Sequence, residues 1–381
     1  MRTLGGEPDG RTFSSDHVVP TFGGDHVVRT FGVEEEFLLL DPRTAQNVPL
    51  ADKVVAALPE PFRERSRREF RPSMIEMVTD VCTSTDDLSR QLRDARAAAT
   101  AAAHSAGATL TAIGATPVAE TDPRSSDDPR FRAITDHYGP IARDPALCGC
   151  HVHVGVADPH LAVDICTRLR ADLPLLQALT ANSPLWLGTD TGYASWRCVQ
   201  LRRWPTVAPW PHLRSVAEFE QTVAALVASG DMMDDSMVLW WARPSRAFPT
   251  VEVRAADVCL DPADTALLAA LVRAMVDTAA HSTAPPVPDV LLHAAHGSAA
   301  RHGMAGTLLD PRTGRAVPAW DLVGALVDRI TPALRHHGDL ETVTAGLHRI
   351  HVDGTGAERQ RRLLARGLSI PDMLARTSTA Q

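Results

Sequence analysis

The chain has 381 residues, of which 44% are hydrophobic and 22% charged, and its formal net charge is −8 at pH 7. This composition is typical of a globular protein and excludes disorder over the whole chain. The acidic balance and the lack of a Lys/Arg cluster disfavour a nucleic-acid partner, because phosphate backbones are bound by clustered cations. We therefore expect small-molecule substrates.

No apolar run is long enough to span a bilayer, and the N-terminus lacks the basic start and apolar segment of a secretory signal. We expect a cytoplasmic protein without membrane contact. The six cysteines include no Cys-x-x-Cys pair, which indicates reduced, packed thiols. A homo-oligomer such as a dimer is the base-rate expectation. Lys53, the one lysine, is not in a P-loop motif, so a nucleotide would need metal and arginine.

Residues 16–23 are nearly repeated at residues 25–32, and one near-copy is not a solenoid. We expect residues 1–28 to be an N-terminal extension and residues 29–375 to form a single domain. Apolar periodicity and turn residues then predict the elements of this domain in chain order. They are a strand at 31–40 with a turn at 41–44, an extended stretch at 69–79, a helix from about 86 to 107, a strand at 109–115, a polar loop at 121–145, a strand at 150–157, helices at about 160–181, 216–229, 262–282 and 320–335, an irregular segment at 182–211, and a strand at 248–258.

Strands and helices alternate without a regular βαβ rhythm, which favours an α+β fold with a largely antiparallel sheet. Period-two alternation places Glu34 and Glu36 on one face of the first strand, with Glu35 on the opposite face. Two further strands carry polar pairs at the same spacing, and a fourth carries a single acid. These residues are His151 and His153, Glu252 and Arg254, and Glu76.

Converging carboxylates repel one another and raise each other's pKa values, whereas bound divalent ions keep them ionised. Oxygen-rich ligation indicates Mg²⁺ or Mn²⁺ rather than zinc. Each pattern alone has an ordinary explanation: Glu-x-Glu is usually a solvated strand face, His-x-His is usually structural, and Val-Glu-Val-Arg is usually a cross-strand ion pair. Their joint occurrence is what predicts a metal site.

The chain resembles the carboxylate-amine ligases related to glutamate–cysteine ligase, within the glutamine synthetase superfamily. Seven motifs carry the resemblance, in order over about residues 29–370. They are Thr-Phe-Gly-Val-Glu-Glu-Glu-Phe at 30–37, Ser-Met-Ile-Glu at 73–76, Gly-Cys-His-Val-His-Val-Gly-Val at 149–156, Ala-Asn-Ser-Pro at 181–184, Asp-Thr-Gly-Tyr-Ala-Ser-Trp-Arg at 190–197, Trp-Trp-Ala-Arg-Pro-Ser at 240–245, and Pro-Thr-Val-Glu-Val-Arg at 249–254.

The resemblance implies a curved, largely antiparallel sheet that binds ATP and metal ions on its concave face, with helices on its convex side. It implies metal ligation by five residues: Glu34, Glu36, Glu76, His151 and Glu252. His153 and Arg254 would contact the transferring phosphate, with Arg243 assisting. Ala242 stands where such families usually carry an acid.

The implied reaction activates a carboxylate, by resemblance that of glutamate, as an acyl phosphate that an amine such as cysteine attacks. Arg197 is the candidate for an α-carboxylate contact, within a substrate-binding loop that includes Tyr193 and Ser195. Two alternatives stay open. A metal-dependent hydrolase could use His151 and His153, and a degenerate regulator could bind ATP without catalysis.

Overall fold

The computed structural model describes residues 28–283 and 285–378, so the predicted extension at 1–28 lies outside the described residues except for Val28. At its centre is a seven-stranded sheet in the order β2-β3-β1-β5-β9-β8, with β4 also paired to β1. Every neighbouring pair in it is antiparallel, which confirms the predicted sheet. Its strands are β1 (Phe31–Leu40), β2 (Ser66–Arg68), β3 (Met74–Val78), β4 (Thr109–Thr111), β5 (Gly149–Gly155), β8 (Ala242–Pro244) and β9 (Thr250–Asp257).

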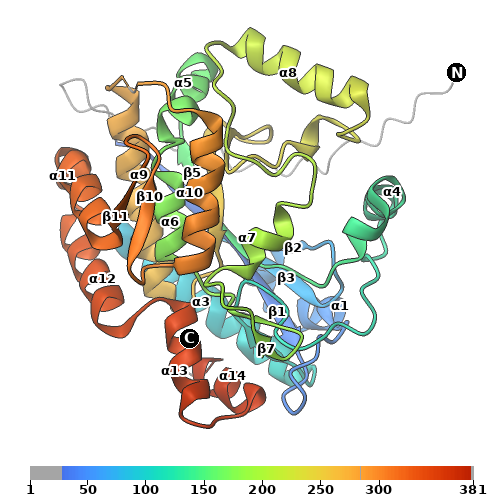
Figure 1. Ribbon diagram of the computed structural model, residues 1–381. Coiled ribbons are helices and arrows are strands. Elements are labelled where there is room, and N and C mark those ends of the chain that lie inside the picture. The colour runs from blue at the N-terminus through green and yellow to red at the C-terminus, as the bar shows by residue number, and fades with distance from the viewer. Residues whose placement is uncertain (1–27, 284, 379–381) are drawn as a thin grey trace, which may run out of the picture.

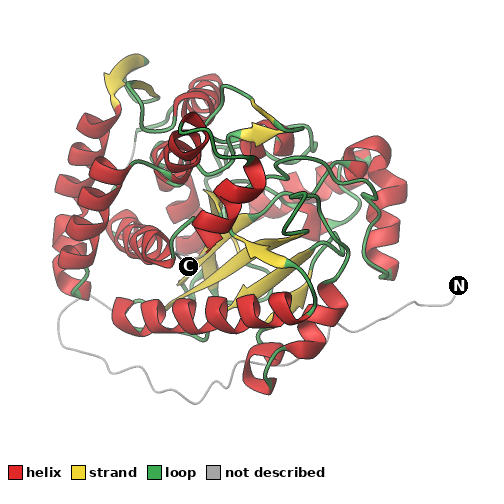
Figure 2. Ribbon diagram, turned by 90° about the horizontal axis from the view of Figure 1, so that it is seen from below, coloured by secondary structure: helices red, strands yellow, loops and turns green. Residues whose placement is uncertain are grey.

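Helices surround this sheet, and two small hairpins lie outside it (Figures 1 and 2). The hairpins are β6 (Leu185–Trp186) with β7 (Thr189–Asp190) and β10 (Thr307–Asp310) with β11 (Arg315–Pro318). The helices are α1 (Ala51–Ala57), α2 (Glu60–Glu64), α3 (Thr85–Ser105), α4 (Pro129–Tyr138), α5 (Pro159–Leu169), α6 (Leu173–Leu179), α7 (Trp196–Leu201), α8 (Val216–Ser229), α9 (Pro262–Ala280), α10 (Asp289–His302), α11 (Ala319–His337), α12 (Leu340–Asp353), α13 (Gly356–Ala365) and α14 (Ile370–Ser378).

Two long helices, α3 and α9, pack behind the central strands. Helix α3 begins where the Ser84 side chain accepts a hydrogen bond from the Asp87 amide. From its buried face Arg96 donates to both carboxylate oxygens of Glu35, at 3.0 and 2.6 Å. Thr265 of α9 donates to the same carboxylate at 2.6 Å. Glu35 therefore points away from Glu34 and Glu36, as the alternation predicts, and a buried ion pair joins the sheet to its helices.

Some predicted boundaries are wrong for identifiable local reasons. The polar loop predicted at 121–145 contains helix α4, because Asp128 caps the Pro129 turn while Ile134 and Tyr138 are buried four residues apart. The helix predicted at about 160–181 is two helices, α5 and α6, with Pro174 in the first turn of the second. The extended stretch at 69–79 is shorter, since β3 begins at Met74 after a turn from β2.

Most other predicted elements are present within a few residues, and β1 has the predicted bounds. All six cysteines are buried and free. Among the described residues, no helix combines the length and the apolar character that a membrane span needs.

Candidate metal and phosphate site

Antiparallel pairing collects the predicted ligands on one face of the sheet. Glu34 lies opposite His151, and Glu36 lies opposite Glu76. Directly paired residues of antiparallel strands project to the same side. By the same rule Glu252 is flanked by His153 and Arg243. The sheet thus brings together all eight residues predicted as metal ligands or phosphate contacts: Glu34, Glu36, Glu76, His151, His153, Arg243, Glu252 and Arg254.

Glu34 lies between the two histidines. Its carboxylate oxygens are 3.2 Å from His151 Nδ1 and 3.3 Å from His153 Nε2. Burial opposes ionisation of Glu34, but the hydrogen bonds to both rings outweigh it and hold the pKa of Glu34 well below its usual value. Burial and the Arg254 charge lower the pKa of His151, which favours the neutral ring that binds metals. Thr250 Oγ1, 2.9 Å from His153 Nδ1, orients the second ring.

Three overlapping groups of side chains could each hold a cation, because their ligand atoms lie within 4.8 Å of one another. Neighbouring groups share Glu34 or Glu76, so the possible cation positions follow one another across the sheet. Most of the ligand atoms are carboxylate oxygens, the donors that Mg²⁺ and Mn²⁺ prefer. The groups are Glu34, His153 and Glu252; Glu34, Glu76 and His151; and Glu36, Glu69 and Glu76.

Glu69 is a candidate site residue that the sequence analysis missed. It follows β2 directly, and its carboxyl group is hydrogen-bonded to that of Glu76. Burial, reinforced by the Glu36 charge, raises the pKa of Glu69 to about 8. Burial and the neighbouring acids raise the pKa of Glu76 well above its usual range. A divalent cation would relieve this repulsion. The available signal was an acid in the otherwise basic stretch 67–71, seven residues before Glu76.

The opposite side of the face is cationic. Arg243 Nε donates to Glu252 Oε2 at 2.8 Å, and Arg254 donates to the other oxygen. Burial opposes ionisation of Glu252, but the two guanidinium groups outweigh it and hold the pKa of Glu252 far below its usual value. Two arginines on one carboxylate leave local positive charge, which suits phosphate oxygens.

The three predicted substrate-binding residues lie beside this face rather than on it. Ser195 is fully buried, caps α7 and donates to Asp257 Oδ1 at 2.9 Å. Arg197 is also buried, with Nη1 3.8 Å from the same oxygen. The half-buried ring of Tyr193 packs instead against Trp196 and under Arg301. Ser195 thus ties the start of α7 to Asp257 of β9.

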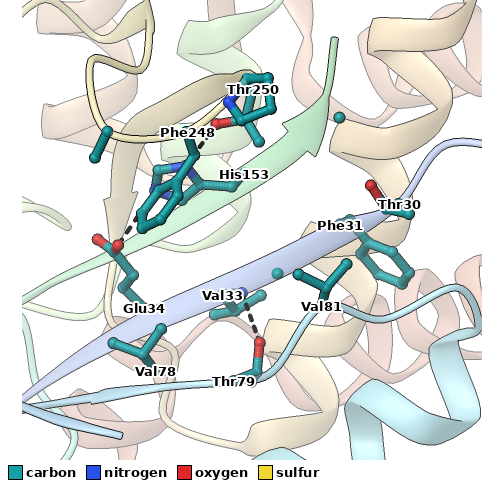
Figure 3. Close-up of a pocket in the computed structure, with 14 residues that line it drawn as sticks. Thr30, Phe31, Val33, Glu34, Val78, Thr79, Val81, His153, Phe248 and Thr250 are labelled. Atoms are coloured by element: carbon teal, nitrogen blue, oxygen red, sulfur yellow. Dashed lines mark hydrogen bonds and ion pairs between the residues drawn. The ribbon is translucent and has the colours of Figure 1, made fainter. Parts of the chain in front are cut away.

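Two pockets adjoin opposite ends of the face. The first, of about 410 Å³, is lined by the start of β1, the end of β5 and residues 247–250. Figure 3 shows Glu34 and His153 at one side of this pocket, with Phe248, Val33 and Val81 among its apolar walls. We call it the β1–β5 pocket. The second, of about 240 Å³, begins at Glu69 and is mostly apolar, and we call it the aromatic pocket. Its walls include Phe70, Met74, Phe131, Ile134, Leu147, Leu201, Trp204, Met237 and Leu239.

A family model described as glutamate-cysteine ligase family 2 matches residues 30–379. The chain belongs to this family. A relative from Salinispora arenicola, provisionally named glutamate–cysteine ligase 2, is 52% identical over 339 residues, which are 88% of this chain and 90% of the relative. A relative from Saccharopolyspora erythraea with a similar provisional name is 42% identical over 347 residues, which are 90% of this chain and 92% of the relative.

The fold is also similar to that of a solved glutamate–cysteine ligase from Francisella tularensis in complex with AMP. The TM-score is 0.65 at 15% identity, and the match covers 93% of this chain and 89% of the other. Family membership makes this protein an ATP-dependent ligase that joins a carboxylate to an amine, and it disfavours the metal-dependent hydrolase.

Proposed function

We propose that the acidic and cationic face transfers the γ-phosphoryl group of ATP to a carboxylate, with two or three Mg²⁺ or Mn²⁺ ions held by its carboxylates and histidines. Bound divalent ions would neutralise phosphate charge and keep the buried acids ionised. The observation that supports this proposal is the row of three overlapping ligand groups ending beside Arg243 and Arg254. Phosphoryl transfer needs positioning and charge neutralisation more than a protein nucleophile.

The β1–β5 pocket suits the nucleoside of ATP. Its walls are mostly apolar, and Glu34 and His153 stand where it meets the ligand groups. A nucleoside in this pocket would direct its phosphates toward Arg254 and Arg243. In the transfer, a carboxylate oxygen of the acid attacks the γ-phosphorus and ADP leaves. Arg254, Arg243 and His153 would stabilise the charge on the transferring group.

The acid and the amine would then approach from the other end, near Glu69 and the aromatic pocket. The amine nitrogen attacks the acyl carbon, phosphate leaves and a proton is lost, which gives an amide. Glutamate and cysteine are the first substrates to test, and the apolar walls also suit amines with larger apolar side chains. The burial of Arg197 fits a positioning role at this end better than direct pairing with a substrate carboxylate.

The decisive experiment incubates the protein with ATP, Mg²⁺, glutamate and a panel of amines that includes cysteine and larger apolar amines. Phosphate release and product mass are measured. We expect amine-dependent phosphate release and a γ-glutamyl amide. Substitution Glu252→Gln should abolish phosphate release without unfolding the protein, because it removes the charge that both arginines and one ligand group share.

Glu220→Gln, an exposed change on α8, serves as the matched control and should behave like the wild type. Activity retained by Glu252→Gln would remove Glu252 from the site. Turnover without ATP would support the hydrolase alternative, and ATP binding without any product across the panel would support the degenerate regulator.

A further inference from the structure

A polar cavity of about 200 Å³ lies where α5, α9 and α11 meet, and we call it the arginine pocket. It is remote from the acidic face. Helix α9 extends from Thr265, which contacts Glu35 behind the sheet, to Thr278, which lines the pocket. At roughly 1.5 Å per residue these two positions are about 20 Å apart. The pocket is therefore separate from the ligase site.

Arginine dominates the charge of this pocket. Its lining includes three arginines, Arg168, Arg312 and Arg329, and one acid, Asp172. Arg312 and Arg329 each donate to a different oxygen of Asp172, both at 2.7 Å. The Asp172 side chain is 11% exposed, whereas those of Arg312 and Arg329 are 32% and 41% exposed. The acid thus lies deep, and the cations lie toward the opening.

Arg168 is the third cation of the pocket, and its hydrogen-bond partners differ from those of Arg312 and Arg329. It donates to the carbonyl of Ala279 in the last turn of α9 at 2.7 Å, and to the half-exposed Asp164 at 2.9 Å. Asp164 is not part of the pocket lining. The lining therefore carries three guanidinium groups and one carboxylate, while Asp164 and Asp310 lie beside Arg168 and Arg312 outside the lining. Each guanidinium group retains N–H donors beyond those that its protein partners use.

The remaining walls strengthen this charge. Leu169, Met275 and Ile330 are buried apolar residues of the lining, and apolar walls focus the field of nearby charges. Thr278 and Ser282 add hydroxyl groups that can donate to an oxyanion. Planar guanidinium groups match the paired oxygens of phosphate and carboxylate groups.

We propose that the arginine pocket binds a small dianion, either a phosphate group or a short dicarboxylate, at Arg168, Arg312 and Arg329. This site goes beyond the proposed ligase reaction and does not depend on it. The bound dianion would join α5, α11 and the turn between β10 and β11 through charge-assisted hydrogen bonds.

The test titrates the full-length protein with inorganic phosphate and, separately, with succinate. It uses calorimetry and thermal unfolding in a buffer that contains EDTA and no ATP. We expect one or both dianions to bind and to raise the melting temperature. The double variant Arg168→Gln/Arg329→Gln should weaken this binding at least tenfold while keeping ligase activity.

Arg335→Gln, an exposed change later on α11, is the matched control and should bind like the wild type. Phosphate that binds to Arg243 and Arg254 at the ligase site would bind equally well in the double variant. The phosphate binding that the double variant loses is therefore the binding at the arginine pocket. Failure of both dianions to bind the wild type, or equal binding by the double variant, would overturn the proposal.

Discussion

The guanidinium group of Arg197 occupies the space that a side chain at Gly149 would need. A β-carbon at position 149 would lie 2.3 Å from Arg197 Nη2, closer than real atoms approach. Gly149 begins β5, and its amide donates to Glu36 of the proposed metal site. The absence of a side chain at this position thus lets the 190–197 loop pack against the end of the central sheet.

Gly149→Ala should therefore displace either Arg197 or the first residue of β5, and with it the carboxylate of Glu36. We expect ligase activity to fall by about 10- to 100-fold, since misplacement of about 1 Å has effects of that size. Steady-state kinetics and thermal unfolding would check this. Wild-type kinetics for Gly149→Ala would show that the packing is not needed for catalysis.

Gly324→Ala is the control for this glycine substitution, and we expect it to stabilise the protein rather than to impair it. Gly324 lies inside helix α11, and a β-carbon there would meet no atom within 4 Å. Alanine should raise the free energy of unfolding by about 0.5–1 kcal/mol, because it restricts the unfolded chain and favours the helix. Chemical denaturation would measure this increase, and ligase activity should not change.

Glu69→Gln should weaken metal binding without destabilising the metal-free protein. Burial and the Glu36 charge raise the pKa of Glu69 to about 8, so its carboxyl group is largely protonated at pH 7 in the metal-free protein and a neutral glutamine changes the charge there little. We expect the Mg²⁺ concentration for half-maximal activity to rise by at least about tenfold with the loss of one carboxylate ligand. A Mg²⁺ titration of activity and melting temperature tests this, with the exposed Glu64→Gln as control. An unchanged Mg²⁺ requirement would exclude Glu69 from the site.

Arg96→Ala should destabilise the fold strongly, because it leaves the Glu35 carboxylate buried with only Thr265 as a partner from α9. Removing one partner of a buried ion pair costs about 3–5 kcal/mol. Arg90→Ala on the same helix should cost little, since the Arg90 side chain is 63% exposed. Urea unfolding would compare the two variants, and similar losses in both would contradict the role given to the Glu35–Arg96 pair.

Buried His296 should make stability depend on pH. Its Nδ1 contacts Gln177 Oε1 at 2.7 Å, and its Nε2 is buried without a hydrogen-bond partner among the described residues. Burial, together with the charges of His293 and Arg202, lowers the pKa of His296 to about 3. The unfolded state takes up a proton near pH 6.5, whereas the folded state does so only near pH 3. The contribution of neutral His296 to the free energy of unfolding is therefore fully present above pH 6.5 and decreases as the pH falls from 6.5 toward 3.

Between pH 6.5 and pH 4, His296 should contribute a slope of up to about 1.4 kcal/mol per pH unit to the free energy of unfolding. His296→Gln should reduce this slope by up to about 1.4 kcal/mol per pH unit, whatever the substitution does to the free energy of unfolding at pH 7.5. Urea unfolding at pH 7.5, 6.5, 5.5 and 4.5 would measure the slope, and exposed His104→Gln should keep the wild-type profile. Equal slopes in all three proteins would contradict the assignment.

The sequence by itself determined the chemistry of each strand face. Side chains alternate with a period of two whatever the strand pairs with, so Glu34 with Glu36, His151 with His153, and Glu252 with Arg254 could be assigned before any partner was known. The same local rule placed Glu35 on the opposite face. Strong local signals also placed α3 and α8 close to their actual bounds.

Only the tertiary structure decided which strands are neighbours, and therefore which side chains lie close enough to share a cation in the proposed site. Glu69 joins Glu36 and Glu76 because β2 pairs with β3 and the residue after β2 lies beside Glu76. A residue in such a connection has no periodicity to reveal its direction. Arg197 reaches Gly149 across 48 residues of sequence, and the arginine pocket assembles from three helices and a hairpin turn. Such contacts depend on packing between distant segments, which no local pattern encodes.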